Sequence, residues 1–150
     1  MKLLVPPPLQ ALICAGLIWL CSFLFPILNF QFEGQNALAI ILVVCGLLID
    51  VLAIRLFSQA KTTISPLDPS KSEQLVTGGI YRRTRNPMYI GMVIFVSAFG
   101  IWIGNWSFVA ILVLFVWYII KFQIKPEEEA LREKFGESYE KYCTEVRRWV

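Results

Sequence analysis

The sequence predicts an all-α integral membrane protein, and this prediction rests on its hydrophobicity, its apolar blocks and its charge distribution. Of its 150 residues, 57% are hydrophobic and 17% are charged, whereas soluble domains average about 25% charged residues. The length is that of one domain, so residues 1–150 are expected to form a single membrane unit.

Four apolar blocks approach the roughly 20 residues that a helix needs to cross a bilayer. The first is longer than the apolar core of a secretion signal, so a retained helix is expected. The third is the shortest, at about 25 Å for a rise of ~1.5 Å per residue. Residues 104–105 make a tight hairpin between the last two blocks. The predicted spans are residues 9–28, 37–57, 88–104 and 106–124.

The basic residues set the expected orientation. Eleven of the 14 Lys and Arg residues fall in the middle loop, residues 58–87, or in the tail, residues 125–150, and none falls in residues 29–36. The positive-inside rule therefore predicts a cytoplasmic loop and two cytoplasmic termini, at the inner membrane if the protein is bacterial. Attraction to anionic membrane lipids accounts for the same charges, so no nucleic-acid partner is expected.

The cysteines do not suggest a metal site. The four cysteines show no C-x-x-C spacing, and the chain has no histidine. Zinc sites usually combine Cys and His ligands at short spacing. We therefore expect no metal, and we interpret the cysteines as small buried side chains.

Two segments do not read as simple scaffold. The loop 58–87, about 30 residues long, keeps several apolar residues, and loops of this length are usually functional or disordered. In the tail, Pro126 suits a first helical turn, and the three glutamates that follow suit the positive end of a helix dipole. Leu131, Phe135, Tyr139 and Tyr142 recur at spacings of four, four and three. One amphipathic cytoplasmic helix is predicted.

The segment 78–91 is the best candidate for a ligand site. It reads Gly-Gly-Ile-Tyr-Arg-Arg-Thr-Arg-Asn-Pro-Met-Tyr-Ile-Gly. Glycines allow a ligand to approach the backbone, arginines suit a carboxylate, and tyrosines can face a cation. A structural interpretation is also open, in which Gly78-Gly79 is a turn and Asn86-Pro87 is the N-cap and first residue of a helix.

Two sequence elements flank the predicted hairpin. Residues 79–91 match Gly-x-Tyr-x-x-x-Arg-(His or Asn)-Pro-x-Tyr-x-Gly. Residues 127–142 match Glu-Glu-x-x-Leu followed by Phe-Gly-x-x-Tyr-x-x-Tyr. Together they resemble the isoprenylcysteine carboxyl methyltransferase and phospholipid methyltransferase superfamily. The resemblance covers residues 75–150, roughly half the chain.

The resemblance implies that S-adenosylmethionine binds in a cytoplasmic pocket and that a lipophilic or lipid-linked acceptor reaches it from the bilayer. Most relatives carry His where this chain has Asn86, and an amide cannot carry a proton at neutral pH. No catalytic residue is assigned. Carried over by motif, the cofactor candidates are Tyr81, Arg85, Asn86, Pro87, Tyr89, Glu127, Glu128 and Leu131.

The acceptor chemistry is only partly constrained. A carboxylate acceptor of the isoprenylcysteine type is already a nucleophile, so positioning alone can supply roughly 7–11 kcal/mol. An amine must first lose a proton, and the sequence offers no base that we would assign. An anionic acceptor is therefore favoured. The alternatives are a phospholipid amine N-methyltransferase, a sterol-reductase-like nicotinamide-dependent enzyme and a small membrane transporter.

Asp50 lies inside the second predicted span. An ionisable residue in a membrane helix is a functional candidate by default. The helical rise puts it about 10 Å from the cytoplasmic end of the span. It either lines the substrate cavity or makes a polar contact with a Ser, Thr or Tyr on a neighbouring helix.

Overall fold

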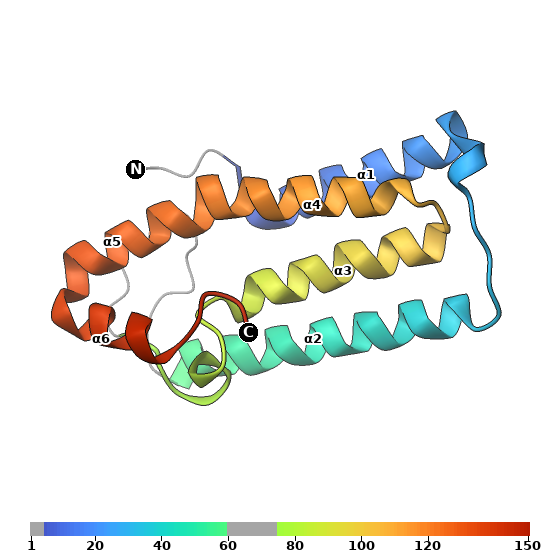
Figure 1. Ribbon diagram of the computed structural model, residues 1–150. Helices are drawn as coiled ribbons and strands as arrows, with labels where there is room; N and C mark the ends of the chain where they lie inside the picture. The colour runs from blue at the N-terminus through green and yellow to red at the C-terminus, as the bar shows by residue number, and fades with distance from the viewer. Residues whose placement is uncertain (1–4, 60–74) are drawn as a thin grey trace.

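The computed structural model describes residues 5–59 and 75–150, and within them it contains helices and no strand (Figure 1). Half of the predicted loop 58–87, residues 60–74, thus lies outside the described residues. An isolated bridge pairs Asn29 with Asn105. The elements are α1 (Pro7–Leu24), η1 (Pro26–Leu28), α2 (Gln35–Gln59), η3 (Gly79–Arg82), α3 (Pro87–Ile103), α4 (Ser107–Ile119), η4 (Ile120–Ile124), α5 (Lys125–Phe135) and α6 (Glu137–Glu145).

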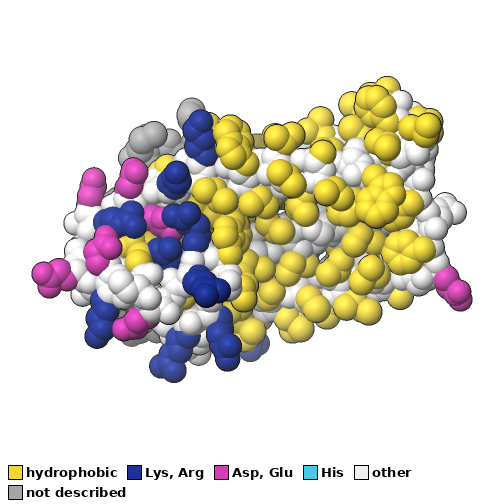
Figure 2. Space-filling view, viewed as in Figure 1, with side chains coloured by type: hydrophobic (Ala, Val, Ile, Leu, Met, Phe, Trp, Pro, Cys, Tyr) yellow, Lys and Arg dark blue, Asp and Glu magenta, His cyan; other side chains and the backbone are white. Residues whose placement is uncertain are grey.

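Three helices in the described ranges are long and apolar enough to cross a membrane: Pro7–Leu24, Gln35–Gln59 and the combined Ser107–Phe135. The third predicted span, residues 88–104, corresponds to α3, which is apolar but has 17 residues. Large hydrophobic side chains are exposed along α1, α2 and α4. Figure 2 shows this apolar surface over most of the bundle. Such a surface suits lipid rather than water, and the chain is an integral membrane protein.

The two ends of the bundle differ in the elements that they carry (Figure 1). The charged end holds η3, α5, α6 and residues 146–150, and most of the Lys, Arg, Asp and Glu side chains visible in Figure 2 gather there. The loop end holds residues 25–36, between α1 and α2, and residues 104–106, between α3 and α4.

Helix α3 lies at the centre and contacts α1, α2 and α4. The buried residues of α2 are all small and lie seven residues apart: Ala39, Gly46 and Ala53. Small residues let two membrane helices approach closely, and Phe95 of α3 fills the space beside Gly46. On its other side, α3 adds Tyr89 and Val96 to the main core. That core also contains Ile18, Phe115, Ile119 and Ile124.

At the loop end, the structure corrects the end of the first predicted span. Helix α1 stops at Leu24, and the short 3-10 turn η1 begins at Pro26. Proline has no backbone N–H and cannot continue an α-helix in register. The predicted hairpin between the last two spans is present: Gly104 ends α3 with φ +73°, a left-handed conformation that favours glycine.

The tail differs from the single amphipathic helix that the spacing predicts. Helix α4 continues through the π turn η4 into α5, so the glutamates of α5 do not sit at a free helix N-terminus and the dipole argument does not apply to them. The chain then breaks at Gly136, with φ +50°, before α6 begins. The predicted apolar residues still meet, because α6 folds back onto α5. Their cluster consists of Tyr139, Tyr142 and Val146, with Leu75, Leu131, Phe135 and Cys143 packed against it.

Candidate functional site

The predicted cofactor residues converge at the charged end from two parts of the chain. One part is η3 with the first residues of α3, and the other is the start of α5. A third part, residues 146–150, joins them although no site residue was predicted there. The contacts among these three segments form the candidate site.

Glu128 is the buried centre of this site, with its side chain 5% exposed. Arg148 binds it through two hydrogen bonds, from Nε to Oε1 at 3.0 Å and from Nη2 to Oε2 at 2.7 Å. Arg85 lies on the other side, with Nη1 at 3.3 Å from Oε1. The hydrogen bonds to Glu128 raise the pKa of Arg148 above its ordinary value. Both carboxylate oxygens of Glu128 are therefore engaged by arginines.

Arg85 is nearly buried, with its side chain 12% exposed. Its Nη1 also donates to Cys143 Sγ. Its Nε is buried and has no hydrogen-bond partner. A buried donor without an acceptor is costly, typically by about 1–3 kcal/mol. This N–H is thus free to donate to an anionic or carbonyl oxygen of a ligand.

Tyr89 connects the hydrophobic core to the second acidic residue of the site. Its ring is buried in the main core on the first turns of α3. Its hydroxyl donates to Glu127 Oε1 at 2.8 Å. The two residues are far apart in sequence, and the hydrogen bond joins the first turns of α3 to the start of α5.

Asn86 stands at the N-cap position of α3, but its side chain does not cap the helix. Its Nδ2 instead donates to the carbonyl oxygen of Arg148 at 2.9 Å. Thr84 Oγ1 donates to the same carbonyl at 3.2 Å and accepts from the Asn86 backbone N–H at 3.1 Å. Asn86 thus occupies the N-cap position of the structural interpretation, but its side chain makes no capping bond. Pro87 is the first residue of α3 and is buried, as its fixed φ allows.

Tyr81 and Tyr142 pair beside this network. The Tyr142 hydroxyl donates to the Tyr81 carbonyl at 2.7 Å. The Tyr81 ring meets Phe57 of α2 edge to face, with 5.4 Å between ring centroids. Burial raises the pKa of both phenols above their ordinary value, so both stay protonated at neutral pH. Leu131 belongs to the tail cluster with Tyr139 and Tyr142 and lies one helical turn beyond Glu127 and Glu128 on α5.

Asp50 lies on α2 against Gly91, the last residue of the first sequence element. A Cβ built on Gly91 would overlap the Asp50 carboxylate. Asp50 Oδ1 is buried without a hydrogen-bond partner. This oxygen therefore does not make the contact with a neighbouring Ser, Thr or Tyr that was one of its two expected roles.

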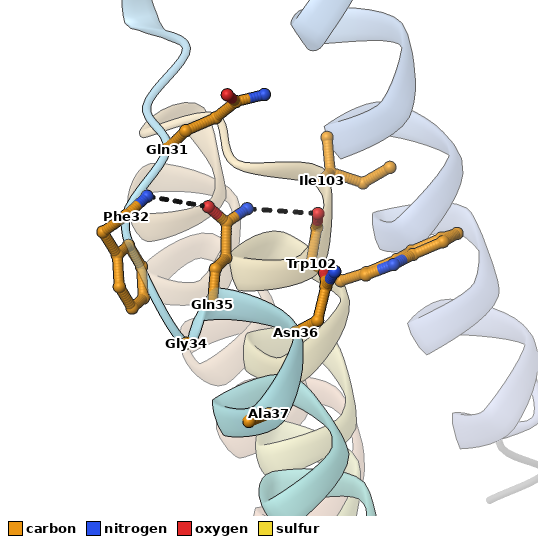
Figure 3. Close-up of a pocket in the computed structure, with 8 residues that line it drawn as sticks. All are labelled: Gln31, Phe32, Gly34, Gln35, Asn36, Ala37, Trp102 and Ile103. Atoms are coloured by element: carbon orange, nitrogen blue, oxygen red, sulfur yellow. Dashed lines mark hydrogen bonds between the residues drawn. The ribbon is translucent and has the colours of Figure 1, made fainter.

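A hollow lies at the loop end, away from these residues. It has a volume of about 400 Å³ and includes Gln35, Trp102 and Ile103 in its lining. Figure 3 shows that Gln35 is already engaged by the chain. Its Oε1 accepts from the Phe32 N–H at 3.3 Å, and its Nε2 donates to the carbonyls of Ile101 and Trp102 at 2.7 and 3.3 Å. The Gln35 side chain therefore joins the carbonyls at the end of α3 to the loop between α1 and α2.

Comparison with known proteins decides the family. A family profile described as phospholipid methyltransferase matches residues 35–138. The chain belongs to the phospholipid methyltransferase family. It is thus a membrane protein of a methyltransferase family. The match covers the first sequence element, the second as far as residue 138, and all the predicted site residues, from Asp50 to Leu131.

Three relatives extend this family assignment. An uncharacterised protein of Haemophilus influenzae is 36% identical over 63 residues, which cover 42% of this chain and all of that protein. A probable protein-S-isoprenylcysteine O-methyltransferase of Oryza sativa is 27% identical over 83% of this chain and 65% of its own length. The protein-S-isoprenylcysteine O-methyltransferase of Schizosaccharomyces pombe is 29% identical over 80% of this chain and 51% of its own length.

The chain therefore spans between half and two thirds of the length of the two named methyltransferases that it resembles. No solved structure matches the chain at a significant level. Among the residues that the structure describes, no group of three or more His, Cys, Asp or Glu could hold a metal ion.

Sequence reasoning missed three residues that build this family member's site: Thr84, Cys143 and Arg148. The available signal was the run Arg147-Arg148-Trp149, which was assigned only to membrane orientation. Arg148 also lies beyond the range that matches the family profile. Its role is visible only once the chain is folded.

Proposed function

We propose that this protein is an S-adenosylmethionine-dependent methyltransferase that acts on a lipophilic or lipid-linked acceptor. The observation that carries the proposal is Arg85, whose buried Nε has no partner beside the acidic pair Glu127 and Glu128. Membership of the phospholipid methyltransferase family supports it. A nicotinamide-dependent reductase or a transporter finds no comparable support in the family match.

The donor groups of the site fit the parts of this cofactor. The Arg85 guanidinium suits the carboxylate of the methionine moiety, because charge-assisted hydrogen bonds are the strong ones. Glu127 accepts from Tyr89 and keeps capacity for a hydroxyl or ammonium donor, since a carboxylate offers about four lone-pair sites. When bound, the cofactor supplies a methyl group on a sulfonium sulfur. The remaining residues assigned to holding it are Tyr81, Asn86, Pro87, Glu128 and Leu131.

The role of the chain is to position the two reactants and to exclude water, and no metal takes part in the proposal. The site lies where the apolar surface of the bundle meets the charged end (Figure 2), so an acceptor with a lipid tail can stay in the bilayer while its head reaches the site. Fixed reactants in a dry site gain most from orientation. The basic residues support a cytoplasmic site, with both termini on that side and four spans.

A carboxylate acceptor is supported by the relatives from rice and fission yeast, which are named as isoprenylcysteine O-methyltransferases. A second candidate is a phospholipid amine, and the unpartnered Asp50 Oδ1 favours it. The Asp50 carboxylate can take one proton from an ammonium acceptor, which leaves the amine lone pair that methylation requires. A carboxylate acceptor needs no such base.

The test is methyl transfer by the detergent-purified protein from radiolabelled S-adenosylmethionine. A prenylated cysteine with a free carboxylate is the main acceptor, its methyl ester is the matched control, and phosphatidylethanolamine tests the amine. We expect label on the free acid and none on the ester. Transfer to the phospholipid that is lost in Asp50→Asn would instead establish the amine. Binding of a nicotinamide nucleotide and not of S-adenosylmethionine would overturn the proposal.

The orientation is tested separately with reporter fusions. Reporters at residue 1, near residue 70 and at residue 150 are expected to report cytoplasm, and a reporter at Gly34 the opposite side. A cytoplasmic signal from Gly34 contradicts the arrangement with four spans.

A further inference from the structure

Residues 146–150 form a closing segment across the candidate site, and both of its ends are anchored. Val146 is buried against the tail cluster of Tyr139 and Tyr142. Trp149 packs against the main core. The closing segment therefore spans from the α5–α6 cluster to the membrane helices, and Arg148 lies between the two anchors.

The backbone of the closing segment is tied to residues 84–86, just before α3. The Arg147 carbonyl accepts from the Arg85 N–H at 3.0 Å. The Arg148 carbonyl accepts from both Asn86 Nδ2 and Thr84 Oγ1. These three bonds fix the position from which the Arg148 side chain extends, and they connect it to the sequence element that carries Arg85.

From this position, Arg148 competes with Arg85 for Glu128. Arg148 makes the two parallel bonds to Glu128, while Arg85 reaches Oε1 only through Nη1. The Nε of Arg85 remains without an acceptor. A guanidinium and a carboxylate left alone in a buried site favour paired bonds. Without Arg148, Glu128 would be able to turn toward Arg85 and occupy that Nε.

The charges of the three groups lead to the same conclusion. The ion cluster holds two guanidinium groups and one carboxylate, Glu127 lies beside it, and Arg85 is the more buried arginine, at 12% exposed against 33% for Arg148. Buried charge that is not neutralised is costly. An anion that arrives beside Arg85 would therefore gain a charge-assisted bond from the unpartnered Nε of the more buried arginine.

We propose that Arg148 is a positioning residue of the cofactor site. By binding both oxygens of Glu128, it keeps the Nε of Arg85 available for the carboxylate of S-adenosylmethionine. This inference rests on the proposed function. It adds a residue outside the matched family range, and it has Glu128 contribute to the cofactor site through the two arginines that it binds.

The test compares Arg148→Gln with Arg147→Gln, which removes the same charge from the adjacent, exposed residue. Binding is measured by calorimetry on the purified protein with two ligands. S-adenosylhomocysteine carries the amino-acid carboxylate, and methylthioadenosine lacks it. We expect Arg148→Gln to lower the affinity for S-adenosylhomocysteine about ten-fold or more, as for a lost hydrogen bond to a charged group. The affinity for methylthioadenosine should stay within about two-fold of wild type. Arg147→Gln should change neither.

Two further variants address a loss of folding. Arg148→Lys keeps the charge but not the paired bonds, and it should lower the affinity for S-adenosylhomocysteine by an intermediate factor of about three. Adding Glu128→Gln to Arg148→Gln removes the charged competitor for Arg85, and affinity should partly recover. That recovery is a coupling that independent structural damage does not produce.

The outcomes separate this inference from the proposed function. If wild type binds neither ligand, the proposed function fails and the inference fails with it. If wild type binds both but Arg148→Gln weakens both equally, Arg148 only supports the fold. Equal affinities in Arg148→Gln and Arg147→Gln also overturn the inference while leaving the methyltransferase proposal intact.

Discussion

The loop end and the charged end are both held by polar side chains that reach main-chain carbonyls, but they use different chemistry. At the loop end, the buried Asn105 donates to the Phe25 carbonyl and to Asn29 Oδ1, and its own oxygen accepts from the Ser107 N–H. At the charged end, Arg85 and Glu128 lie in a network that leaves a buried donor unpaired.

The difference supports the proposal that the ligand site lies at the charged end, where the unpartnered donor belongs to a charged group; at the loop end the buried atom without a partner is the neutral Ser107 Oγ. An amide whose donor and acceptor are both used within the chain has nothing left for a ligand, whereas a buried unpaired guanidinium N–H calls for an explanation. The hollow in Figure 3 is at the loop end, where Gln35 is already paired. The site that we propose is therefore not at this hollow.

The substitution with the largest expected effect is Glu128→Ala, which tests the ion cluster of the charged end. It leaves the guanidinium groups of Arg85 and Arg148 without their shared carboxylate, and removal of one partner from a buried ion cluster costs roughly 3 kcal/mol. We expect a lower free energy of unfolding and a large loss of S-adenosylhomocysteine affinity. Glu129→Ala, at the exposed neighbour, is the control and should change neither. Chemical denaturation and calorimetry measure both quantities. Unchanged stability in Glu128→Ala would contradict the ion cluster.

Asn105→Ala tests the other end. It removes the side chain that joins residues 25–29 to the start of α4, and the backbone groups left unpaired should lower the free energy of unfolding by about 2 kcal/mol. The affinity for S-adenosylhomocysteine should stay the same in the folded protein. An affinity loss comparable to that of Glu128→Ala would show that the two ends are coupled and that the contrast is mistaken.

Tyr89→Phe sharpens the contrast within the charged end. It deletes the hydroxyl that donates to Glu127 and keeps the ring in the core. Loss of a hydrogen bond to a charged group should cost about 1.5 kcal/mol. If Glu127 holds a cofactor hydroxyl or ammonium, its orientation also matters, and affinity should fall several-fold. Stability loss without any affinity loss removes Glu127 from the site.

The smallest expected effect is at Asn86. Asn86→Asp loses the donor to the Arg148 carbonyl and places a negative charge beside it, so the unfolding free energy should fall by about 1 kcal/mol. Cofactor affinity should fall with it, because the closing segment loosens. Asn86→His keeps a ring N–H donor and should stay within a few-fold of wild type. Equal stability and affinity in Asn86→Asp and wild type would remove this residue from the site.

The helices were predictable because the length of an apolar block is a local property of the sequence. Boundaries fell within a few residues, and the main errors lie at Pro26, which ends α1 early, and at Gly136, which breaks the tail. The break was hidden because Leu131, Phe135 and Tyr139 keep a helical spacing across it. These residues meet by folding of α6 onto α5 rather than along one helix face.

The site was only partly predictable, since its contacts join residues that are distant in sequence. The two sequence elements identify Arg85, Tyr89, Glu127 and Glu128, but nothing local says that Arg148 binds Glu128. An arginine near a membrane surface is already explained by orientation, so its second role gave no separate signal. The same holds for Asn86, which follows the sequence pattern of a cap while its side chain bonds to the Arg148 carbonyl.

The π turn of η4 determines which side of α5 carries Glu127 toward Tyr89. The Lys125 N–H bonds to the Ile120 carbonyl, five residues back rather than four, so the turn accommodates one residue more than an α-helix would. Each helical residue turns the chain by about 100°. Deleting one residue here would leave apolarity and charge almost unchanged, yet it would rotate Glu127 and Glu128 more than a quarter turn away from Tyr89 and Arg85. The residues of η4 therefore matter more for how many they are than for which side chains they carry. Selection in this turn should act on insertions and deletions before it acts on substitutions.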